Sequence, residues 1–515
     1  MHIIHSWLEK ATIQCPEKIA LITKEGQFSY QWLHDMSNRF AEQLIQRCQA
    51  KPGDRIALML PNNVRHIVAY YGILKIGAIV VPIHGSLKCH EMMYIFEDSE
   101  ASILITDSSY LDEVEMVLTK RESHIEHCIV NNMDKPLDGL GRSFLNMDDF
   151  LSNCPNKPAD DDCIKVTEYD IAVIFYTSGT MGMPKGVMIS HRNIVQKMHP
   201  LNDAMDLTSE DRILCGLPIV YVYGQVMSMH LSIWRQSTLI LLDEESVNNV
   251  LEMMENHNPT VMMSIPTTYY RLKQIDRPSK EKHISQLRYA ITGGSNISIH
   301  LKKEFEAKYG IKLLDSYGLT ETTACVIIEQ PGDVRKPGSI GKPIANNDVQ
   351  ILDEFGLELP PGQIGEIAIR SKSVMQGYFK NELKQNESLK NGWFHTGDMA
   401  YQDINGNFFI VDRRKDIIQT AGFVVVPHEV EEVLSRHPLI IDSAVVGMPD
   451  SERGEIIKAY LVIKPGSFLS QNELAAYTRK YLAKFKCPTV FELVDKLPRN
   501  KSGKLLKRLL KEIIQ

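Results

Sequence analysis

The strongest constraint on the fold is an alternation, in the first part of the chain, between short β-rich runs and helical patterns. The β-rich runs cover residues 18–23, 55–60, 79–83 and 101–106. The helical pattern after the first run repeats Leu33, Met36, Phe40 and Leu44. Because strands separated by helices join most simply through crossover connections, this order predicts a layered α/β domain with largely parallel strands.

The pattern of predicted strands, turns and helices changes twice further along the chain. From about 332 to 411, short strands alternate with turns such as Asp353-Glu-Phe-Gly356, which predicts a small, barrel-like β subdomain. After 416 the pattern resets to a compact α+β unit, in which Pro427 suits a first helical turn. We therefore predict an N-terminal domain over residues 1–411, a hinge over 412–416 and a small α+β C-terminal domain over 417–515.

Composition excludes several classes of function. The 515 residues exceed one ordinary core, and a net charge of −7 argues against the basic face that nucleic acid requires. The nine cysteines lack metal-ligand spacing, and no uncharged apolar stretch approaches the ~18 residues of a membrane span. The first ten residues contain no apolar run behind a basic segment. We expect a cytoplasmic protein with reduced cysteines, no nucleic-acid partner and no membrane span.

A loop of small residues, Tyr176-Thr-Ser-Gly-Thr-Met-Gly-Met-Pro-Lys-Gly186, separates two apolar runs. Its backbone N–H groups and hydroxyls can approach anionic oxygens, and Lys185 adds a positive charge. It differs from an ordinary P-loop, because Pro184 and Gly186 replace the second glycine and the Mg-binding hydroxyl. A strand-like Val-Met-Ile run also follows, where a P-loop requires a helix. By composition alone such a segment is more often a plain turn.

Four further motifs follow in a fixed order. They are Thr292-Gly-Gly-Ser295, Asp315-Ser-Tyr-Gly-Leu-Thr-Glu321, Gly392-Trp-Phe-His-Thr-Gly-Asp398 and Leu497-Pro-Arg-Asn-Lys-Ser-Gly-Lys504. In isolation each has a plainer interpretation: a close backbone approach, a loop before a capped helix, a turn or a solvated tail. Together with the loop, they resemble the adenylate-forming superfamily of acyl-CoA synthetases, peptide-synthetase adenylation domains and beetle luciferases.

The resemblance implies an acid–thiol ligase that uses ATP, Mg²⁺ and coenzyme A. A carboxylic acid and ATP would give acyl-AMP and pyrophosphate, and the acyl group would then pass to the thiol of CoA. Between the two half-reactions, the C-terminal domain would rotate about a hinge at Lys415 and present Gly422 to the thiol tunnel.

The resemblance also assigns roles to single residues. Lys504, Thr320 and Glu321 would be catalytic, with Lys504 bridging the attacking carboxylate and the α-phosphorus. Glu321 and Thr177 would contact the metal. ATP or AMP would be bound by Thr177, Ser178, Gly179, Thr180, Lys185, Gly294, Ser295, Asp315, Ser316, Tyr317, Gly318, Thr320, Asp398, Arg413 and Lys504.

The acid is the least specified part. The segment Leu217-Pro-Ile-Val-Tyr-Val-Tyr-Gly224 departs from the family's usual Leu-Pro-Leu-Phe-His, with Tyr221 at the histidine position. No acidic residue lies between 214 and 230 to pair with a substrate ammonium, which disfavours an α-amino acid. We expect a fatty or aryl acid. The candidate acyl pocket comprises Tyr221, Tyr223, Met227, Ile291 and Gly293.

Alternatives remain for the acceptor of the acyl group and for the class of reaction. The stretch from Gly338-Ser-Ile-Gly-Lys-Pro343 to Arg370 lacks the insertion of fatty-acyl-AMP ligases, which favours CoA over the pantetheine of an acyl or peptidyl carrier protein. A luciferase-like monooxygenase would share the adenylation site. A non-catalytic nucleotide-binding relative is the third alternative. Such a protein would be expected to lack one of Lys504, Glu321 and Asp398, and all three are present.

Overall fold

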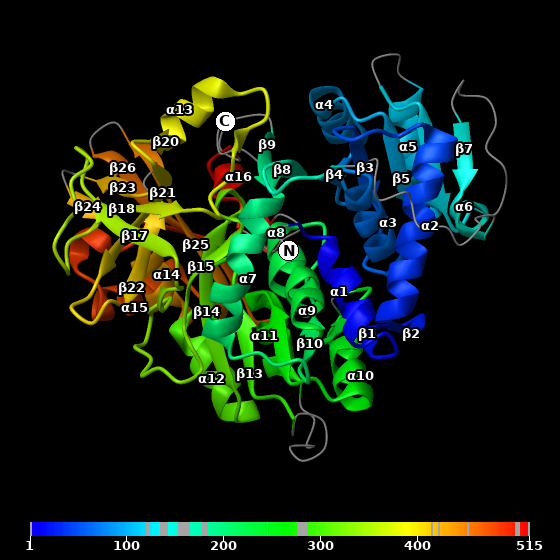
Figure 1. Ribbon diagram of the computed structural model, residues 1–515. Helices are drawn as coiled ribbons and strands as arrows, with labels where there is room; N and C mark the ends of the chain where they lie inside the picture. The colour runs from blue at the N-terminus through cyan, green and yellow to red at the C-terminus, as the bar shows by residue number, and fades with distance from the viewer. Residues whose placement is uncertain are drawn as a thin grey trace.

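Two mostly parallel sheets with flanking helices form the first part of the molecule, in the centre and at the right of Figure 1. The structure is a computed structural model. It describes residues 3–119, 124–133, 143–152, 165–177, 184–244, 246–275, 286–413, 416–420, 423–450, 453–499 and 505–512.

The eight-stranded sheet carries the base of the small-residue loop. Its order is β19-β9-β8-β4-β3-β5-β6-β7, and the strands from β8 to β7 are parallel. The bounds are β3 (Arg55–Met59), β4 (Ile79–Pro82), β5 (Ile103–Asp107), β6 (His127–Asn131), β7 (Ser143–Asn146), β8 (Ile171–Thr177), β9 (Lys185–Ser190) and β19 (Gly377–Tyr378). All five residues of β5 are buried, as expected for a strand covered on both faces.

The nine-stranded sheet carries two of the glycine-containing motifs. Its order is β16-β15-β14-β13-β12-β10-β11-β1-β2, parallel from β14 to β1, with antiparallel strands at both edges. The bounds are β1 (Ile19–Thr23), β2 (Gly26–Ser29), β10 (Arg212–Cys215), β11 (Thr238–Leu241), β12 (Val261–Ser264), β13 (Tyr289–Thr292), β14 (Lys312–Leu319), β15 (Ala324–Ile328) and β16 (Lys342–Pro343).

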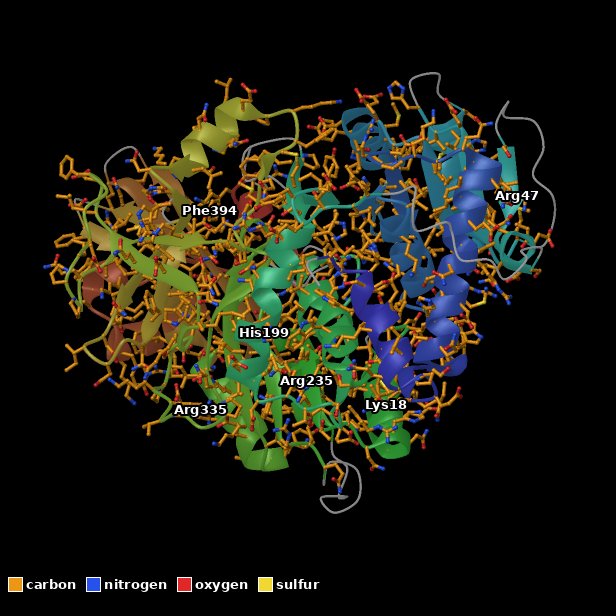
Figure 2. All side chains as sticks on the ribbon, in the orientation of Figure 1. Lys18, Arg47, His199, Arg235, Arg335 and Phe394 are labelled. Atoms are coloured by element: carbon orange, nitrogen blue, oxygen red, sulfur yellow. The ribbon has the colours of Figure 1, made fainter. Side chains whose placement is uncertain are left out.

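Helices pack on these sheets through apolar faces. Ser29 caps α2 (Tyr30–Cys48), whose Leu33, Phe40 and Leu44 are fully buried or nearly so. His199, labelled in Figure 2, lies on α7 (His191–Met205). Its ring packs edge-on against Trp234 on α9 (Leu231–Arg235). The other helices of this part are α1 (Ser6–Gln14), α3 (Val64–Lys75), α4 (Cys89–Ser99), α5 (Leu111–Leu118), α6 (Met147–Ser152), α8 (Val222–Gly224), η2 (Gln225–His230), α10 (Val247–His257), α11 (Pro266–Gln274) and α12 (Ile299–Tyr309).

An antiparallel sheet follows, and then a small α+β unit beside it at the left of Figure 1. The sheet contains β17 (Asn347–Leu352), β18 (Gly365–Ser371), β20 (Leu389–Lys390), β21 (Trp393–Gln402) and β22 (Phe408–Arg413), and α13 (Glu382–Ser388) precedes β20. The last unit contains β23 (Ile418–Thr420), β24 (Phe423–Val425), α14 (Pro427–Ser435), β25 (Ile440–Asp450), β26 (Gly454–Ile463), α15 (Gln471–Tyr481), η4 (Lys484–Lys486), β27 (Val490–Leu493) and α16 (Lys507–Glu512).

This architecture confirms the predicted fold class, a large α/β part followed by a smaller α+β part, whereas the domain and hinge boundaries stay predictions. One local interpretation differs. Residues 315–319 continue β14 instead of forming a loop, because β15 pairs with them along that edge, and η3 (Thr320–Thr322) follows as a short 3-10 helix. Seven of the cysteines lie in described segments and are not in disulfide bonds, and two of the seven are only partly buried. None of the described helices combines the length and apolar character that a membrane span requires.

Candidate functional site

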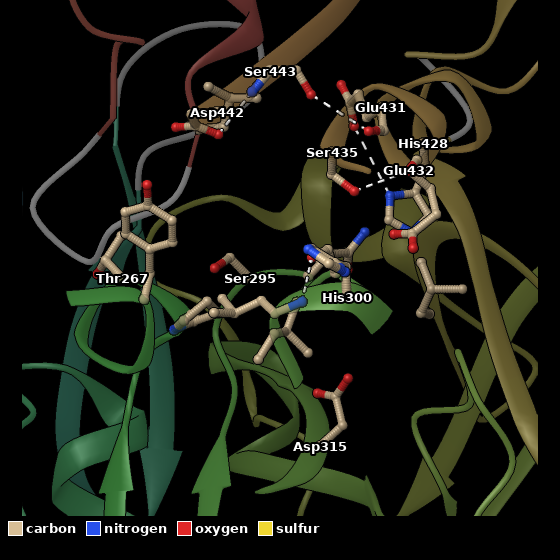
Figure 3. A pocket seen from close by; sticks show the side chains of 18 of the residues that line it. Thr267, Ser295, His300, Asp315, His428, Glu431, Glu432, Ser435, Asp442 and Ser443 are labelled. Atoms are coloured by element: carbon tan, nitrogen blue, oxygen red, sulfur yellow. Dashed lines mark hydrogen bonds and ion pairs between the residues drawn. The ribbon is translucent and has the colours of Figure 1, made fainter. Parts of the chain in front are cut away.

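A cavity of about 920 Å³ lies between the large α/β part and the C-terminal unit. One side is lined by predicted nucleotide-binding residues, which we call the floor: Gly294, Ser295, Asp315, Ser316, Tyr317, Gly318 and Asp398. The opposite side is lined by polar residues of the C-terminal unit, which we call the cover: His428, Glu431, Glu432, Asp442, Arg499 and Lys507. In Figure 3 Ser295 and Asp315 lie on one side and Glu431, Glu432 and Asp442 face them from the other.

The floor joins two motifs that are far apart in the sequence. The hydroxyl of Tyr317 on β14 donates a hydrogen bond of 2.7 Å to Oδ2 of Asp398 on β21. Asp398 is 6% exposed and lies opposite Arg413 in the β21–β22 register. The residue predicted to stack on adenine therefore contacts the carboxylate predicted to bind ribose.

Asp315 sits behind these two residues in a carboxyl-rich pocket. Its backbone N–H donates to Oε2 of Glu329 at 2.8 Å, and Glu329 forms an ion pair with Lys302. Burial raises the pKa of the Asp315 carboxyl to about 7; Lys302 opposes this shift and Glu329 adds to it. Near neutral pH the carboxyl is partly protonated, so it can both donate and accept hydrogen bonds.

Two glycines of the floor are required by backbone geometry. Gly294 has φ of +79°, a left-handed conformation that L side chains rarely adopt. A Cβ on Gly318 would lie 2.0 Å from the carbonyl oxygen of Ala324 on the paired strand. Packing within the sheet therefore explains Gly318, whether or not a nucleotide approaches it.

The two strands that flank the small-residue loop, β8 and β9, are paired with each other. Thr177 at the end of β8 and Lys185 at the start of β9 are Cα partners in an antiparallel pair. The hydroxyl of Tyr176 donates to Oδ2 of Asp98 at 2.5 Å, which ties β8 to the end of α4. This geometry confirms the strand after Lys185 and the departure from the P-loop design.

Lys185 and Glu321 both contact a third residue, Tyr378. The hydroxyl of Tyr378 on β19 donates to Oε1 of Glu321 at 3.0 Å. The ammonium of Lys185 lies 5.4 Å from the centroid of the Tyr378 ring. Burial lowers the pKa of Lys185, with Lys384 adding to the shift and Glu321 opposing it. The predicted phosphate-binding lysine and the predicted metal carboxylate therefore belong to one cluster.

Glu321 fits a site for Mg²⁺. A magnesium site at a polyphosphate needs only one or two carboxylates from the protein, since phosphate oxygens and water complete the octahedron. Oε2 of Glu321 has no hydrogen-bond partner among the described residues. In the segments that the structure describes, no group of three or more His, Cys, Asp and Glu side chains is placed to hold a metal ion.

The candidate acyl pocket is only partly assembled around the floor. Oη of Tyr223 lies 3.3 Å from Oγ of Ser316, and a Cβ on Gly293 would lie 3.0 Å from that Oη. Tyr221 instead stacks on His84, with ring centroids 5.5 Å apart. Met227 and Ile291 are fully buried in the hydrophobic core. Among the described residues, these five candidates are not in the lining of the large cavity.

The cover is held together by charges. Nζ of Lys507 on α16 lies 2.9 Å from Oε1 of Glu431 and 3.7 Å from Oδ2 of Asp412. Burial lowers the pKa of Lys507, but Glu431 and Asp412 outweigh this effect and the pKa is raised overall. Arg499 pairs with Asp442 at 2.8 Å. The carboxylate of Glu432 accepts a hydrogen bond from the backbone N–H of Ile299, which joins the cover to α12 of the large part.

Several predicted residues lie outside the described segments. They are Ser178, Gly179, Thr180, Lys415, Gly422 and Lys504. Arg413 is placed only through the backbone of β22. Thr320 is the first residue of η3, next to Glu321.

Sequence reasoning missed three residues that contact predicted site residues and help to hold them in place. Tyr378, Glu329 and His84 each contact a predicted site residue. No local pattern marked them, because each contact joins separate segments of the chain. Lys507 was part of a basic tail that gave no sign of burial.

Comparison with known families gives two matches. Residues 8–379 match the family described as AMP-binding enzyme. Residues 429–504 match its AMP-binding enzyme C-terminal domain. The first match covers the floor except Asp398, and the second covers much of the cover.

Curated relatives are similar over most of their length. The long-chain-fatty-acid–CoA ligase of Bacillus subtilis is 34% identical over 484 residues, which are 89% of this chain and 85% of the relative. The crotonobetaine/carnitine–CoA ligase of Citrobacter koseri is 33% identical over 507 residues, 96% of either protein.

A solved structure adds information on conformation. ATP-bound MatB from Rhodopseudomonas palustris is 28% identical, with 99% of both chains covered and a TM-score of 0.89. The apo form of MatB gives a TM-score of 0.79, with 99% of this chain and 98% of that chain covered, at 30% identity. The conformation described here is therefore closer to the ATP-bound form of that protein.

Proposed function

This chain belongs to the AMP-binding enzyme family, and we propose that it is an AMP-forming acyl-CoA synthetase. The single observation that carries the proposal is the cavity, where Tyr317 and Asp398 are already hydrogen-bonded beside Asp315. Relatives that are similar over most of their length are CoA ligases, which supports the same reaction.

The first half-reaction forms a mixed anhydride. A carboxylate oxygen of the acid bonds to the α-phosphorus of ATP, and the bond from that phosphorus to the bridging oxygen of pyrophosphate breaks. We propose that Tyr317 stacks on adenine, Asp398 holds the ribose hydroxyls and Thr320 contacts the α-phosphate. Lys504 would offset the negative charge shared by the attacking carboxylate and the phosphate.

The phosphate end would be held by the small-residue loop and by Glu321. Lys185 and the loop that begins at Thr177 would bind the β- and γ-phosphates. Glu321 and Thr177 would hold Mg²⁺, whose chemistry here is to neutralise charge on the leaving pyrophosphate. This neutralisation lowers the cost of bringing two anions together.

The second half-reaction transfers the acyl group. The sulfur of CoA bonds to the acyl carbon, the bond from that carbon to the AMP oxygen breaks, and the thiol proton is lost to solvent or base. Rotation of the C-terminal unit at Lys415 would replace Lys504 by Gly422 near the acyl carbon. The likeness to ATP-bound MatB supports the assignment of the present conformation to the first half-reaction.

The substrate proposal follows from the pocket and the relatives. A fatty or aryl acid fits the absence of a carboxylate between residues 214 and 230. A carrier-protein pantetheine arm is the alternative acceptor, and a cytoplasmic location remains the prediction.

Acid-dependent exchange of labelled pyrophosphate into ATP tests the proposal. A panel of fatty, aryl and amino acids and carnitine would be assayed, and the active acids would then be incubated with CoA for mass spectrometry. We expect exchange with a fatty or aryl acid, loss of exchange in Lys504→Ala, and an acyl-CoA product. Exchange without an acyl-CoA product would indicate carrier-protein loading. The absence of exchange with every acid of the panel would contradict the proposal.

A further inference from the structure

A tyrosine that no motif singled out lies between two charged groups of opposite sign. Tyr378 is 5% exposed and follows Gly377 in β19, a two-residue strand paired with β9. Its hydroxyl faces Glu321, and its ring faces the ammonium of Lys185. The side chain therefore contacts both residues that the proposed function assigns to magnesium and phosphate.

The backbone around Tyr378 fixes this position. The N–H of Met375 donates to the carbonyl of Glu321 at 2.8 Å, and the N–H of Phe379 donates to the carbonyl of Gly186 at 2.7 Å. Tyr378 is the Cα partner of Val187. One short segment is thus bonded to η3 at one end and to β9 at the other, which fixes the backbone from which the Tyr378 side chain projects.

The opposite charges of Lys185 and Glu321 explain why a neutral side chain between them is useful. Lys185 and Glu321 carry opposite charges and both contact Tyr378, so they attract one another. Direct contact would neutralise both charges and remove them from a bound polyphosphate. No ion pair joins these two side chains in the described structure, and the aromatic ring accepts the cation on its face.

The hydroxyl has a defined role as a donor. The Tyr378 hydroxyl donates a hydrogen bond of 3.0 Å to Oε1 of Glu321. That bond occupies Oε1 and orients the carboxylate, while Oε2 remains available for a metal ion. A phenylalanine at this position would keep the ring and lose this bond, together with the contact of the hydroxyl with Ser388.

We propose that Tyr378 is a positioning residue that holds Glu321 for Mg²⁺ and keeps Lys185 apart from it for the phosphates. This inference rests on the proposed function. It predicts that the two ends of the tyrosine act separately. The hydroxyl would affect Mg²⁺ binding through Glu321, and the ring would affect phosphate binding through Lys185.

Equilibrium binding of ATP tests the inference, because without an acid no adenylation occurs. Calorimetric titration with ATP would be done with excess Mg²⁺ and again in EDTA, on the wild type, Tyr378→Phe, Tyr378→Leu and Tyr289→Phe. Tyr289 on β13 is a matched control, because it is 2% exposed and its hydroxyl donates to the backbone carbonyl of Met205, the last residue of α7. Thermal unfolding would verify that each variant is folded.

We expect Tyr378→Phe to weaken binding about five- to tenfold with Mg²⁺ and less than about twofold in EDTA. Tyr378→Leu should weaken binding in both conditions, since Lys185 would be free to pair with Glu321. Tyr289→Phe should leave the ratio between the two conditions unchanged.

Two results would overturn the inference. Tyr378→Phe could bind ATP like the wild type in both conditions, or it could lose the same factor in both, as a general structural role would require. A wild-type protein that binds no ATP would instead overturn the proposed function on which the inference rests, and the two failures are therefore distinguishable.

Discussion

The floor and the cover of the cavity are built from different interactions. In the floor, Tyr317, Ser316 and Asp315 lie on one strand, with hydrogen bonds to Asp398, to the Thr292 carbonyl and to Glu329. In the cover, Lys507 and Arg499 hold their neighbours through ion pairs with carboxylates. The floor thus inherits the rigidity of a buried sheet, whereas the cover depends on charges.

This difference suits a site that must bind and then rearrange. A floor fixed by sheet packing can hold a nucleotide through both half-reactions. The cover is joined to the rest of the molecule by polar contacts, those of Lys507 and His428 with Asp412 on β22 and that of Glu432 with Ile299 on α12. It can therefore separate without exposing the large hydrophobic core. Substitutions in the two regions should therefore have distinct signatures.

The largest effect is expected from Lys504→Ala. Because one preorganised cation at a developing charge is typically worth a factor of about 10² to 10³, acid-dependent pyrophosphate exchange should fall by that factor. Thioester formation from supplied acyl-adenylate should change less than about threefold. Lys501→Ala, in the same motif, is the control and should resemble the wild type. An equal loss in both half-reactions would contradict the assignment of Lys504 to adenylation alone.

Lys507→Met should have the next largest effect, on stability. It leaves Glu431 and Asp412 without their buried cation, which typically costs about 3–5 kcal/mol of unfolding free energy. Hydrogen exchange should locate the loss in the C-terminal unit and leave the sheets of the large part protected. Lys303→Met, at an exposed position of α12, should change stability by less than about 0.5 kcal/mol. Loss of protection in the floor would show that the two regions unfold together.

Tyr317→Phe tests the floor. It removes one hydrogen bond to a carboxylate, so ATP affinity should fall by about tenfold, equivalent to about 1.4 kcal/mol. Unfolding of the C-terminal unit should be unaffected. Calorimetric titration and hydrogen exchange would check both statements, and an unchanged ATP affinity would contradict the assignment of this pair to the nucleotide.

The smallest effect concerns the pH dependence of the floor. Because the pKa of Asp315 is raised to about 7 from an unfolded value of about 3.9, its contribution to stability is present at low pH and is lost as pH rises through about 7. Between pH 6 and pH 8 the wild type should lose about 1 kcal/mol relative to Asp315→Asn. Denaturant unfolding at both pH values measures this difference. Parallel pH profiles would refute the titration of Asp315 in this range.

The sequence indicated that the floor residues lie close together because their motifs are local. Thr292-Gly-Gly-Ser295 and the segment from Asp315 to Glu321 end adjacent parallel strands, so recognising each motif also indicates where it lies. The strand conformation of 315–319 was not predicted, since it depends on pairing with β15. Tyr378 was out of reach because its partner Glu321 is 57 residues away.

The cover was harder to predict for a different reason. Lys507 lies in a basic tail, where a lysine is usually solvated, and only the folded unit brings Glu431 and Asp412 to it. The replacement of the family's usual histidine by Tyr221 was visible in the sequence. Its stacking partner His84 was not predicted, because it lies in the distant segment between β4 and α4. Ion pairs and ring contacts between distant segments leave no periodic pattern.

The most direct test of the central claim follows oxygen. An active acid carrying oxygen-18 in its carboxylate would be incubated with ATP, Mg²⁺ and CoA, and the nucleotide product would be analysed by mass spectrometry. The account predicts AMP that carries one oxygen-18 for each acyl-CoA formed, because the attacking carboxylate oxygen stays on phosphorus. ADP as the product, or AMP without the label, would contradict an acyl-adenylate and with it the proposed function.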